Sequence, residues 1–351
     1  MLYLCYSIND FSAMSAGISL LSFLENNPGY EPDEVFFVDF GLHPINKKKL
    51  DGIATRYSKH VTFLDARQVT AQVRRDFPHL RSWRGTMAPN AKCFMDLIVP
   101  EYVERLLFID ADTLVVGSVD ELSHMDMGGA ALAAVPQCWE TCMIRLGRLK
   151  LYADTDMYFN SGVLLYDMNV WRRENCHQMI VDTLRVKKQF YSPDQTLLNN
   201  AIPGRLLCRL PLKYNHLTHW MHPRQELKFL SVGGIHTVQE IDEMKRHPVI
   251  IHYTGGDHHA RPWHKGCRSY RTAEYPHYKA LSPWKEVALF PRQTCTRQGV
   301  AGKGALLYFW MASKQPSLAL TTAVMRLNHY INRLQVRWHK AQPPVPEGVE
   351  A

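Results

Sequence analysis

The chain has 351 residues, of which 46% are hydrophobic, 11% aromatic and 21% charged, with 20 Gly and 20 Pro. This composition excludes an intrinsically disordered or collagen-like protein, and the length predicts one large α/β domain with an appendage, or two domains. No stretch reaches the roughly 18 uninterrupted apolar residues of a membrane-spanning helix, and the N-terminus lacks the pattern of a signal peptide. We therefore expect the eight Cys to be buried, reduced thiols rather than disulfides.

The net charge of +8 is concentrated near the C-terminus. Residues 287–346 contain eight Lys and Arg and not one Asp or Glu, so the first 286 residues form a nearly neutral body. A protein that is basic throughout would suggest nucleic acid, whereas a local block predicts one anionic surface met by one end of the molecule. We accordingly expect no nucleic-acid partner.

Short apolar runs alternate with helix-like periodicity along the body, which is typical of βαβ units and a mostly parallel sheet. Strands are predicted at residues 2–6, 34–40, 61–64, 105–109, 130–135, 162–166 and 249–253. Helices are predicted at residues 14–24, 47–57, 89–98, 171–187 and 194–200. The expected domains are an α/β domain over residues 1–286, a basic segment over residues 287–341 and a disordered tail over residues 342–351.

Two carboxylates follow the fourth predicted strand, in Phe-Ile-Asp110-Ala111-Asp112-Thr. In open α/β sheets, ligands bind at the carboxyl ends of the strands. Residues at i and i+2 share a face, so Asp110 and Asp112 can hold one divalent cation that neutralises phosphate oxygens. The alternative is a pair of solvated carboxylates. Because strand-end carboxylates stabilise little structure, we expect the fold to survive their replacement.

Three further segments place polar residues at the ends of predicted elements. Asn160, Ser161 and Gly162 precede an apolar strand, and the Gly permits close approach of a ligand to the backbone. Asp194 and Gln195 begin a helix, where one can cap the helix and the other can face a site.

The third segment is His252-Tyr-Thr-Gly255, which follows the late strand and is itself followed by Arg261-Pro262-Trp263. Taken singly, these segments have ordinary structural explanations: a turn, a helix cap and a core histidine.

Together and in this order, the four segments resemble glycosyltransferase family 8, whose members are retaining sugar-nucleotide enzymes. They include bacterial lipopolysaccharide and lipooligosaccharide α-galactosyl- and α-glucosyltransferases. The resemblance extends from about residue 2 to residue 263. It implies an α/β nucleotide-binding fold of the GT-A type, to which the basic C-terminal appendage is added.

The resemblance also implies which residues act. It implies a metal site at Asp110, Asp112 and His252, where the imidazole favours Mn²⁺ and leaves Mg²⁺ as the alternative. The residues implied at the reaction centre are Asp194 and Gln195. The residues implied to bind the donor are Asn9, Asp10, Phe11, Lys92, Asp110, Ala111, Asn160, Ser161, Gly162, Gly255 and Arg261.

Several positions depart from the family pattern. Phe11 stands where relatives have a Tyr that stacks on uracil, and Lys92 stands where they usually have an Arg. Relatives often carry a carboxylate after the strand at 130–135, whereas Gln137 is found here. Arg261 replaces a Lys and can still contact the β-phosphate in a bidentate manner.

These features predict metal-dependent transfer of a hexose, galactose or glucose, from a UDP-hexose to a hydroxyl of a lipopolysaccharide core or another lipid-linked glycan. Retention requires either a double displacement through a protein nucleophile or front-face attack. Gln195 is a poor nucleophile and Asp194 is a chemically competent one, and front-face attack is favoured. A sugar-phosphate nucleotidyltransferase is the alternative, but residues 7–15 lack its Gly-rich basic loop. A second alternative is a non-catalytic scaffold that binds sugar or membrane. The presence of all three residues Asp110, Asp112 and His252 argues against it.

The basic segment predicts membrane attachment. Between residues 320 and 338, apolar side chains recur at spacings of three and four, with basic residues on another stripe. This pattern is typical of a helix lying in an anionic membrane interface. The alternative is a helix whose apolar stripe docks on the body. We expect a cytoplasmic protein that lies peripherally on the inner membrane.

Overall fold

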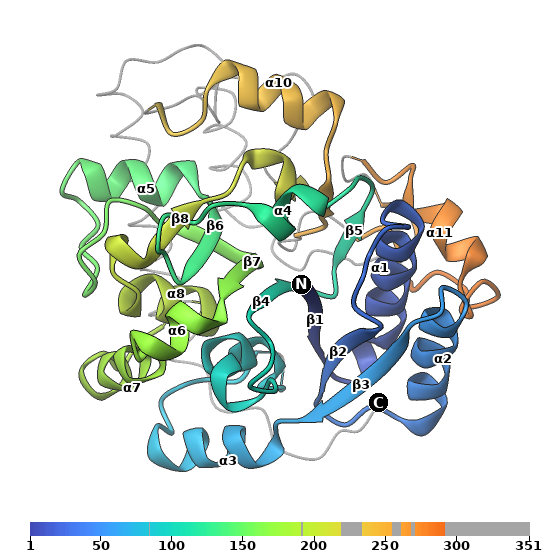
Figure 1. Cartoon of the computed structure of the whole chain (residues 1–351), viewed down its shortest axis with the longest axis horizontal. Helices are drawn as coiled ribbons and strands as arrows, with labels where there is room; N and C mark the ends of the chain where they lie inside the picture. The colour runs from blue at the N-terminus through green and yellow to red at the C-terminus, as the bar shows by residue number, and fades with distance from the viewer. Residues whose placement is uncertain (84, 191, 219–233, 255–260, 268–270, 292–351) are drawn as a thin grey trace.

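A seven-stranded sheet forms the centre of the computed structural model, which describes residues 1–83, 85–190, 192–218, 234–254, 261–267 and 271–291 (Figure 1). Its strand order is β3-β2-β1-β4-β7-β6-β8. The strands are β1 (Leu2–Ile8), β2 (Glu34–Asp39), β3 (His60–Asp65), β4 (Arg105–Ile109), β6 (Leu132–Pro136), β7 (Phe159–Asp167) and β8 (Leu207–Arg209). The predicted α/β class is confirmed.

The sheet is mostly parallel, as predicted, and β7 is the exception. β1 pairs in parallel with β2 and β4, β2 with β3, and β6 with β8, while β7 is antiparallel to both β4 and β6. A reversed strand begins where its neighbours end. The first residues of β7 therefore lie beside the residues that follow β4, and the Asp110 amide donates to the Gly162 carbonyl at 2.8 Å.

Helices cover both faces of the sheet (Figure 1). Side chains alternate along β1, so that Leu4 and Tyr6 pack with α1, α2 and α11, whereas Cys5 packs on the other face with η2, α6, α7 and α8. The helices are α1 (Ala13–Asn26), α2 (Pro44–Thr55), α3 (Arg67–Asp76), α4 (Asp120–His124), α5 (Cys138–Arg145), α6 (Met168–Arg173), α7 (Cys176–Val186), α8 (Pro193–Ala201), α10 (Val238–Arg246) and α11 (Tyr275–Leu281). The 3₁₀ helices are η1 (Asp10–Ser12), η2 (Ala88–Leu97), η3 (Gly204–Leu206) and η4 (Leu212–Tyr214).

A second, three-stranded sheet brings a late segment of the chain to the edge of the main sheet. It has the order β5-β10-β9, formed by β5 (Thr113–Val115), β10 (Ile250–His252) and β9 (His216–Leu217). β10 is antiparallel to β5, and this register places His252 opposite Thr113, next to the paired carboxylates. The Tyr253 amide donates to the Asp112 carbonyl at 2.8 Å.

Two predicted helices differ from the structure. The helix expected at 89–98 is the 3₁₀ helix η2, which is interrupted at Phe94 (φ −131°, ψ 33°). The helix expected at 171–187 is divided into α6 and α7 by Asn175, which adopts a left-handed conformation with φ 54°. Asn tolerates this conformation better than most residues, and apolar periodicity alone does not reveal such a break. Helices α3, α4, α5, α10 and α11 and strands β5, β8 and β9 were not predicted.

The basic C-terminal segment and the tail lie outside the described residues from 292 onward, so the structure describes only residues 287–291 of the segment. The last described part packs on the body: Phe290 donates its amide to the Trp263 carbonyl at 2.9 Å. In the described ranges, no helix combines the length and apolar character needed to cross a membrane. Cys5, Cys93, Cys138, Cys142 and Cys176 are buried, as predicted, whereas Cys208 on the edge strand β8 and Cys267 are only partly buried, and Cys295 lies outside the described residues.

Candidate active site

Two carboxylates and an imidazole meet at the carboxyl end of β4. Nε2 of His252 lies 3.2 Å from Oδ1 of Asp112 and 3.9 Å from Oδ2 of Asp110. One ligand atom from each of the three residues lies within 4.8 Å of the other two. Asp110 and Asp112 stand in the turn between β4 and β5, and His252 ends β10.

This donor set fits a divalent cation. Carboxylate oxygens suit Mg²⁺ and Mn²⁺, and an imidazole nitrogen shifts the preference toward the later first-row ion. The three ligand atoms all lie within 4.8 Å of one another, a separation at which they can share one ion. The predicted juxtaposition of Asp110, Asp112 and His252 is thus present in the structure, and the identity of the ion stays a prediction.

Lys92 connects one of these carboxylates to Asp194. Its side chain is only 1% exposed, and its ammonium contacts Oδ1 of Asp110 at 2.8 Å, Oδ2 of Asp194 at 3.0 Å and the Ser161 carbonyl at 3.0 Å. Burial alone would lower the pKa of Lys92, but the two carboxylates outweigh it and raise that pKa. All three N–H donors of the ammonium therefore have acceptors within the protein.

The position of Lys92 changes one expectation. Asp110 neutralises a buried ammonium, so we expect its replacement to lower stability, in addition to any effect on the predicted metal site. Burial raises the pKa of Asp110, and Lys92 offsets this only in part because Asp112 raises it further. For Asp194, burial alone would raise the pKa, but Lys92 and the Ser161 hydroxyl, which donates to Oδ2 at 2.8 Å, lower it.

Asp112 is held by Arg261 on the side away from His252. The guanidinium donates to Oδ2 of Asp112 at 2.7 Å and to the Tyr253 carbonyl at 3.2 Å. Burial by itself would raise the pKa of Asp112, but Arg261 and then His252 outweigh it, so the pKa falls well below its usual range. Asp112 is therefore a carboxylate, the form that binds metal, throughout the physiological pH range.

Gly162 makes room for the imidazole of His252. A Cβ atom at this position would lie 2.0 Å from Cε1 and 2.6 Å from Nδ1 of His252. The sequence predicts that this Gly permits close approach of a ligand to the backbone. The structure shows that it also makes room for the His252 imidazole, and its contact with a donor stays a prediction. Any larger residue must displace the ring.

Gly162→Ala is therefore expected to weaken Mn²⁺ binding by about 10- to 100-fold, the usual effect of disturbing how a metal ligand is held. Crowding of the buried ring should also cost about 1–3 kcal/mol of unfolding free energy. Metal titration and urea unfolding measure the two effects. Gly52→Ala in α2 is the control, because nothing lies within 4 Å of its added Cβ. Equal Mn²⁺ affinity in both variants would contradict this explanation.

A row of side-chain amides continues from His252 across the site. Asn215 contacts Nδ1 of His252 at 3.0 Å and donates to Oδ1 of Asn160 at 2.9 Å. Asn160 donates to Oε1 of Gln195 at 3.0 Å, and Gln195 donates to Oε1 of Gln137 at 2.9 Å. The structure thus brings together the predicted residues Asn160, Gln195 and His252.

Sequence reasoning missed two members of this row. Gln137 follows β6 at the carboxyl edge, where the family pattern directs attention to a carboxylate rather than an amide. Asn215 precedes the two-residue strand β9 and carries no recognisable motif. Its role depends on the pairing of β9 with β10, which short-range patterns do not predict.

The residues predicted to bind the nucleoside follow β1, next to β4. Asp10 accepts from the His43 amide and from Asn46, both at 2.8 Å, and Asn9 accepts from the Ser12 hydroxyl at 3.2 Å. Their contact with a donor stays a prediction.

Three other residues were predicted to bind the sugar-nucleotide donor: Phe11, Ala111 and Gly255. The Phe11 side chain is 72% exposed and stacks on Phe290, with ring centroids 6.2 Å apart. Ala111 packs against the core between the two metal-site carboxylates. Gly255 lies outside the described residues.

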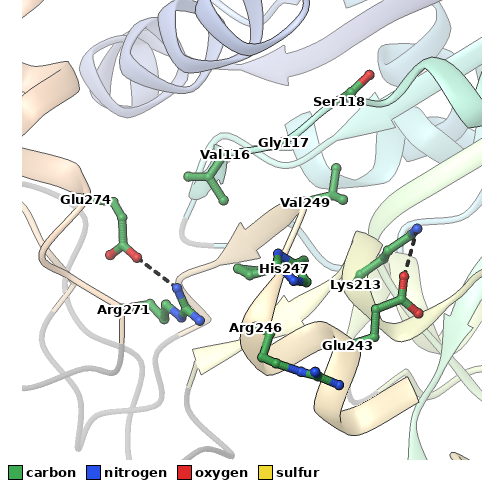
Figure 2. A pocket seen from close by; sticks show the side chains of 11 residues that line it. Val116, Gly117, Ser118, Lys213, Glu243, Arg246, His247, Val249, Arg271 and Glu274 are labelled. Carbon is green, nitrogen blue, oxygen red and sulfur yellow. Dashed lines mark hydrogen bonds and ion pairs between the residues drawn. The ribbon is translucent and has the colours of Figure 1, made fainter. Parts of the chain in front are cut away.

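A pocket of about 480 Å³ lies at the opposite end of β10 from His252 (Figure 2). Its Lys213 pairs with Glu243 at 3.0 Å and its Arg271 with Glu274 at 3.2 Å. These ion pairs compensate much of the charge within the pocket. The site chemistry described above lies at the other end of the strand.

Residues 3–267 match the family described as glycosyl transferase family 8. General stress protein A of Bacillus subtilis is 25% identical over 283 residues, which cover 80% of this chain and 93% of that protein. A lipopolysaccharide 1,2-glucosyltransferase of Escherichia coli K12 is 30% identical over 188 residues, covering 52% and 51%. A lipopolysaccharide 1,3-galactosyltransferase of Salmonella typhimurium is 22% identical over 311 residues, covering 86% and 84%.

Solved structures agree on the fold. Galactosyltransferase LgtC, in complex with donor and acceptor sugar analogs, aligns with a TM-score of 0.63 at 19% identity, covering 81% of this chain and 96% of that one. The bifunctional glycosyltransferase WbbM aligns with a TM-score of 0.67 at 19% identity, covering 81% and 50%, so this chain spans half of WbbM. The predicted GT-A fold is confirmed.

Proposed function

The chain belongs to glycosyl transferase family 8, and from this we propose that it transfers a hexose, galactose or glucose, from a UDP-sugar to a hydroxyl of a lipopolysaccharide core or another lipid-linked glycan. The observation that carries the proposal is the group of Asp110, Asp112 and His252 beside Asn160 and Gln195. The names of the relatives from Escherichia coli and Salmonella typhimurium support a lipopolysaccharide acceptor.

We further propose that the anomeric configuration is retained through front-face attack. The bond between the anomeric carbon and the β-phosphate oxygen breaks, the acceptor oxygen bonds to the same carbon face, and the acceptor proton passes to the departing β-phosphate. A divalent ion bound by Asp110, Asp112 and His252 would neutralise charge on the diphosphate. Asp194 is a weak candidate nucleophile because its carboxylate is bound by Lys92 and Ser161.

The direct test is incubation of the full chain with Mn²⁺ and a panel of UDP-sugars, followed by measurement of released UDP. Release that requires Mn²⁺ and stops in EDTA is expected. A nucleotidyltransferase would instead make a sugar nucleotide and pyrophosphate from a sugar phosphate and UTP, and a binding scaffold would give neither product. Mass spectrometry that traps a glycosyl adduct on Asp194 would overturn front-face attack.

Gln195 should act on the reacting sugar rather than only on donor binding. Gln195→Ala is expected to lower kcat by about 100-fold, comparable with loss of one preorganised polar group, and to change KM much less. Steady-state kinetics with the best UDP-sugar measure both constants. Gln178→Ala is the control, because Gln178 is an exposed amide on α7 whose side chain donates to Asp182, outside the site. A raised KM at unchanged kcat would leave Gln195 only a binding role.

The C-terminal segment is proposed to hold the enzyme on the cytoplasmic face of the inner membrane, near a lipid-linked acceptor. Its eight basic residues and lack of acids support this, since each base near an anionic leaflet contributes about 1 kcal/mol. The full chain should co-sediment with phosphatidylglycerol-containing liposomes at low salt and less at high salt. A chain ending at Arg297 retains all described residues and should stay in the supernatant. If both chains pellet equally, the segment is not the anchor.

A further inference from the structure

The backbone of β7 determines how the side-chain amides in the row that ends at His252 are oriented, that is, which neighbour each amide oxygen and each amide nitrogen faces. The Gly162 N–H donates to Oδ1 of Asn160 at 2.9 Å, and the Ser161 N–H donates to Oε1 of Gln195 at 3.3 Å. A backbone N–H can only donate. Both side chains must therefore direct their oxygens toward β7, and the amide orientations follow from the hydrogen-bond network.

The orientation of the Asn160 amide in turn determines the orientation of the Asn215 amide, which contacts His252. Oδ1 of Asn160 also accepts a hydrogen bond from the side-chain nitrogen of Asn215. The side-chain oxygen of Asn215 must therefore face His252. That oxygen can only accept, which requires the proton of a neutral imidazole to reside on Nδ1. Nε2 then carries a lone pair, and Nε2 is the atom that faces Asp110 and Asp112.

Burial makes the arrangement rigid. Asn215 is fully buried and His252 is 3% exposed, so water cannot readily replace either hydrogen bond. Gly162 lies so close to the imidazole that its backbone leaves no room for a side chain, and this contact limits rotation of the ring. Neither the tautomer nor the ring orientation has to be reorganised when a cation binds.

We propose that Asn215 is a positioning residue that selects the metal-binding tautomer of His252 and couples it to Asn160 and Gln195. The inference rests on the proposed metal site. Histidine ligands generally need a partner on the second ring nitrogen, and loss of that partner weakens metal binding by about 10- to 100-fold. Here the partner is the buried amide of Asn215. Its orientation is determined through two successive hydrogen bonds, from Asn215 to Asn160 and from Asn160 to the backbone of β7.

Two substitutions distinguish the two side-chain hydrogen bonds of Asn215, one to His252 and one to Asn160. Asn215→Asp keeps an oxygen that accepts from Nδ1 of His252 but cannot donate to Asn160. Asn215→Leu loses both contacts. Asn27→Leu is the matched control, because Asn27 is a buried amide bonded to the Phe23 carbonyl and the Val119 amide, outside the site.

The readouts are ¹⁵N NMR of histidine-labelled, metal-free protein, with the His252 signals assigned by comparison with His252→Gln, and titration with Mn²⁺ alone. Wild type, Asn215→Asp and Asn27→Leu should show His252 protonated on Nδ1 and similar Mn²⁺ affinities. Asn215→Leu should show mixed tautomers and bind Mn²⁺ about 10- to 100-fold more weakly. In a UDP-release assay, Asn215→Asp should have a reduced kcat, since the contact to Asn160 is lost.

Unchanged tautomer and unchanged Mn²⁺ affinity in Asn215→Leu would overturn the proposal. If that variant does not fold, loss of the Nδ1–H tautomer in Asn215→Asp would overturn it instead. The NMR and metal titration use no sugar donor, so they are independent of the proposed reaction. A protein that shows the predicted tautomer behaviour but releases no UDP would refute the function and leave the role of Asn215 standing.

Discussion

Asp112→Asn is expected to lower Mn²⁺-dependent turnover by about a thousandfold, which corresponds to about 4 kcal/mol of transition-state stabilisation from the metal. The substitution keeps the size of the side chain and removes its charge. Asp112 is the carboxylate of the proposed metal site whose pKa is held low by Arg261 and His252, so the wild-type group is ionised at neutral pH. The amide would also lose most of its attraction for Arg261.

Turnover with and without EDTA, together with Mn²⁺ titration of the metal-free protein, measures this effect. Asp182→Asn on α7 is the control, since that carboxylate is exposed and pairs with Arg185 on the same helix. Activity that survives in EDTA, or in the Asp112→Asn protein, would show that the assigned metal site is wrong.

Lys92→Met should destabilise the protein by about 3–5 kcal/mol, because it leaves the Asp110 and Asp194 carboxylates without their shared buried cation. Met has a similar length and no charge, so the loss is electrostatic rather than a cavity. Because a bound cation can compensate part of the excess negative charge, added Mn²⁺ should stabilise this variant more than it stabilises wild type.

Urea unfolding with and without Mn²⁺ tests this expectation. Lys92→Arg preserves the positive charge but changes the shape of the side chain, so it distinguishes the electrostatic contribution from the packing contribution. It should retain most of the stability that Lys92→Met loses. A Lys92→Met protein as stable as wild type would mean that the three-way contact of the ammonium contributes little. Equal losses in the Met and Arg variants would attribute the effect to packing instead.

The candidate residues of the site were largely predictable because chemistry and element ends coincide in the sequence. Asp110 and Asp112 follow an apolar strand whose predicted bounds, 105–109, match β4. The carboxyl edge of a parallel sheet gathers such residues whatever the strand order. The place of His252 in the site was implied by the family resemblance, because its position at a late apolar strand would by itself be that of an ordinary core histidine.

The partners of these residues were not predictable in the same way. The Lys92 ammonium was expected to reach the donor, and nothing in the sequence indicated its contacts with Asp110, Asp194 and Ser161. Gly162 was expected to permit close approach of a ligand, and the sequence did not indicate that it also packs against His252. In each case the contact joins segments far apart in the chain, and local periodicity contains no information about which strands become neighbours.

By itself the sequence determined the α/β class, the strand that carries the paired carboxylates, and the residue types available for metal and sugar. The tertiary structure decided what those residues do for one another. The reversal of β7 places the Asn160 segment at the edge where β4 ends, and the pairing of β9 with β10 places Asn215 against His252. Strand order and direction are set by the packing of whole layers, so they depend on the entire core rather than on any one motif.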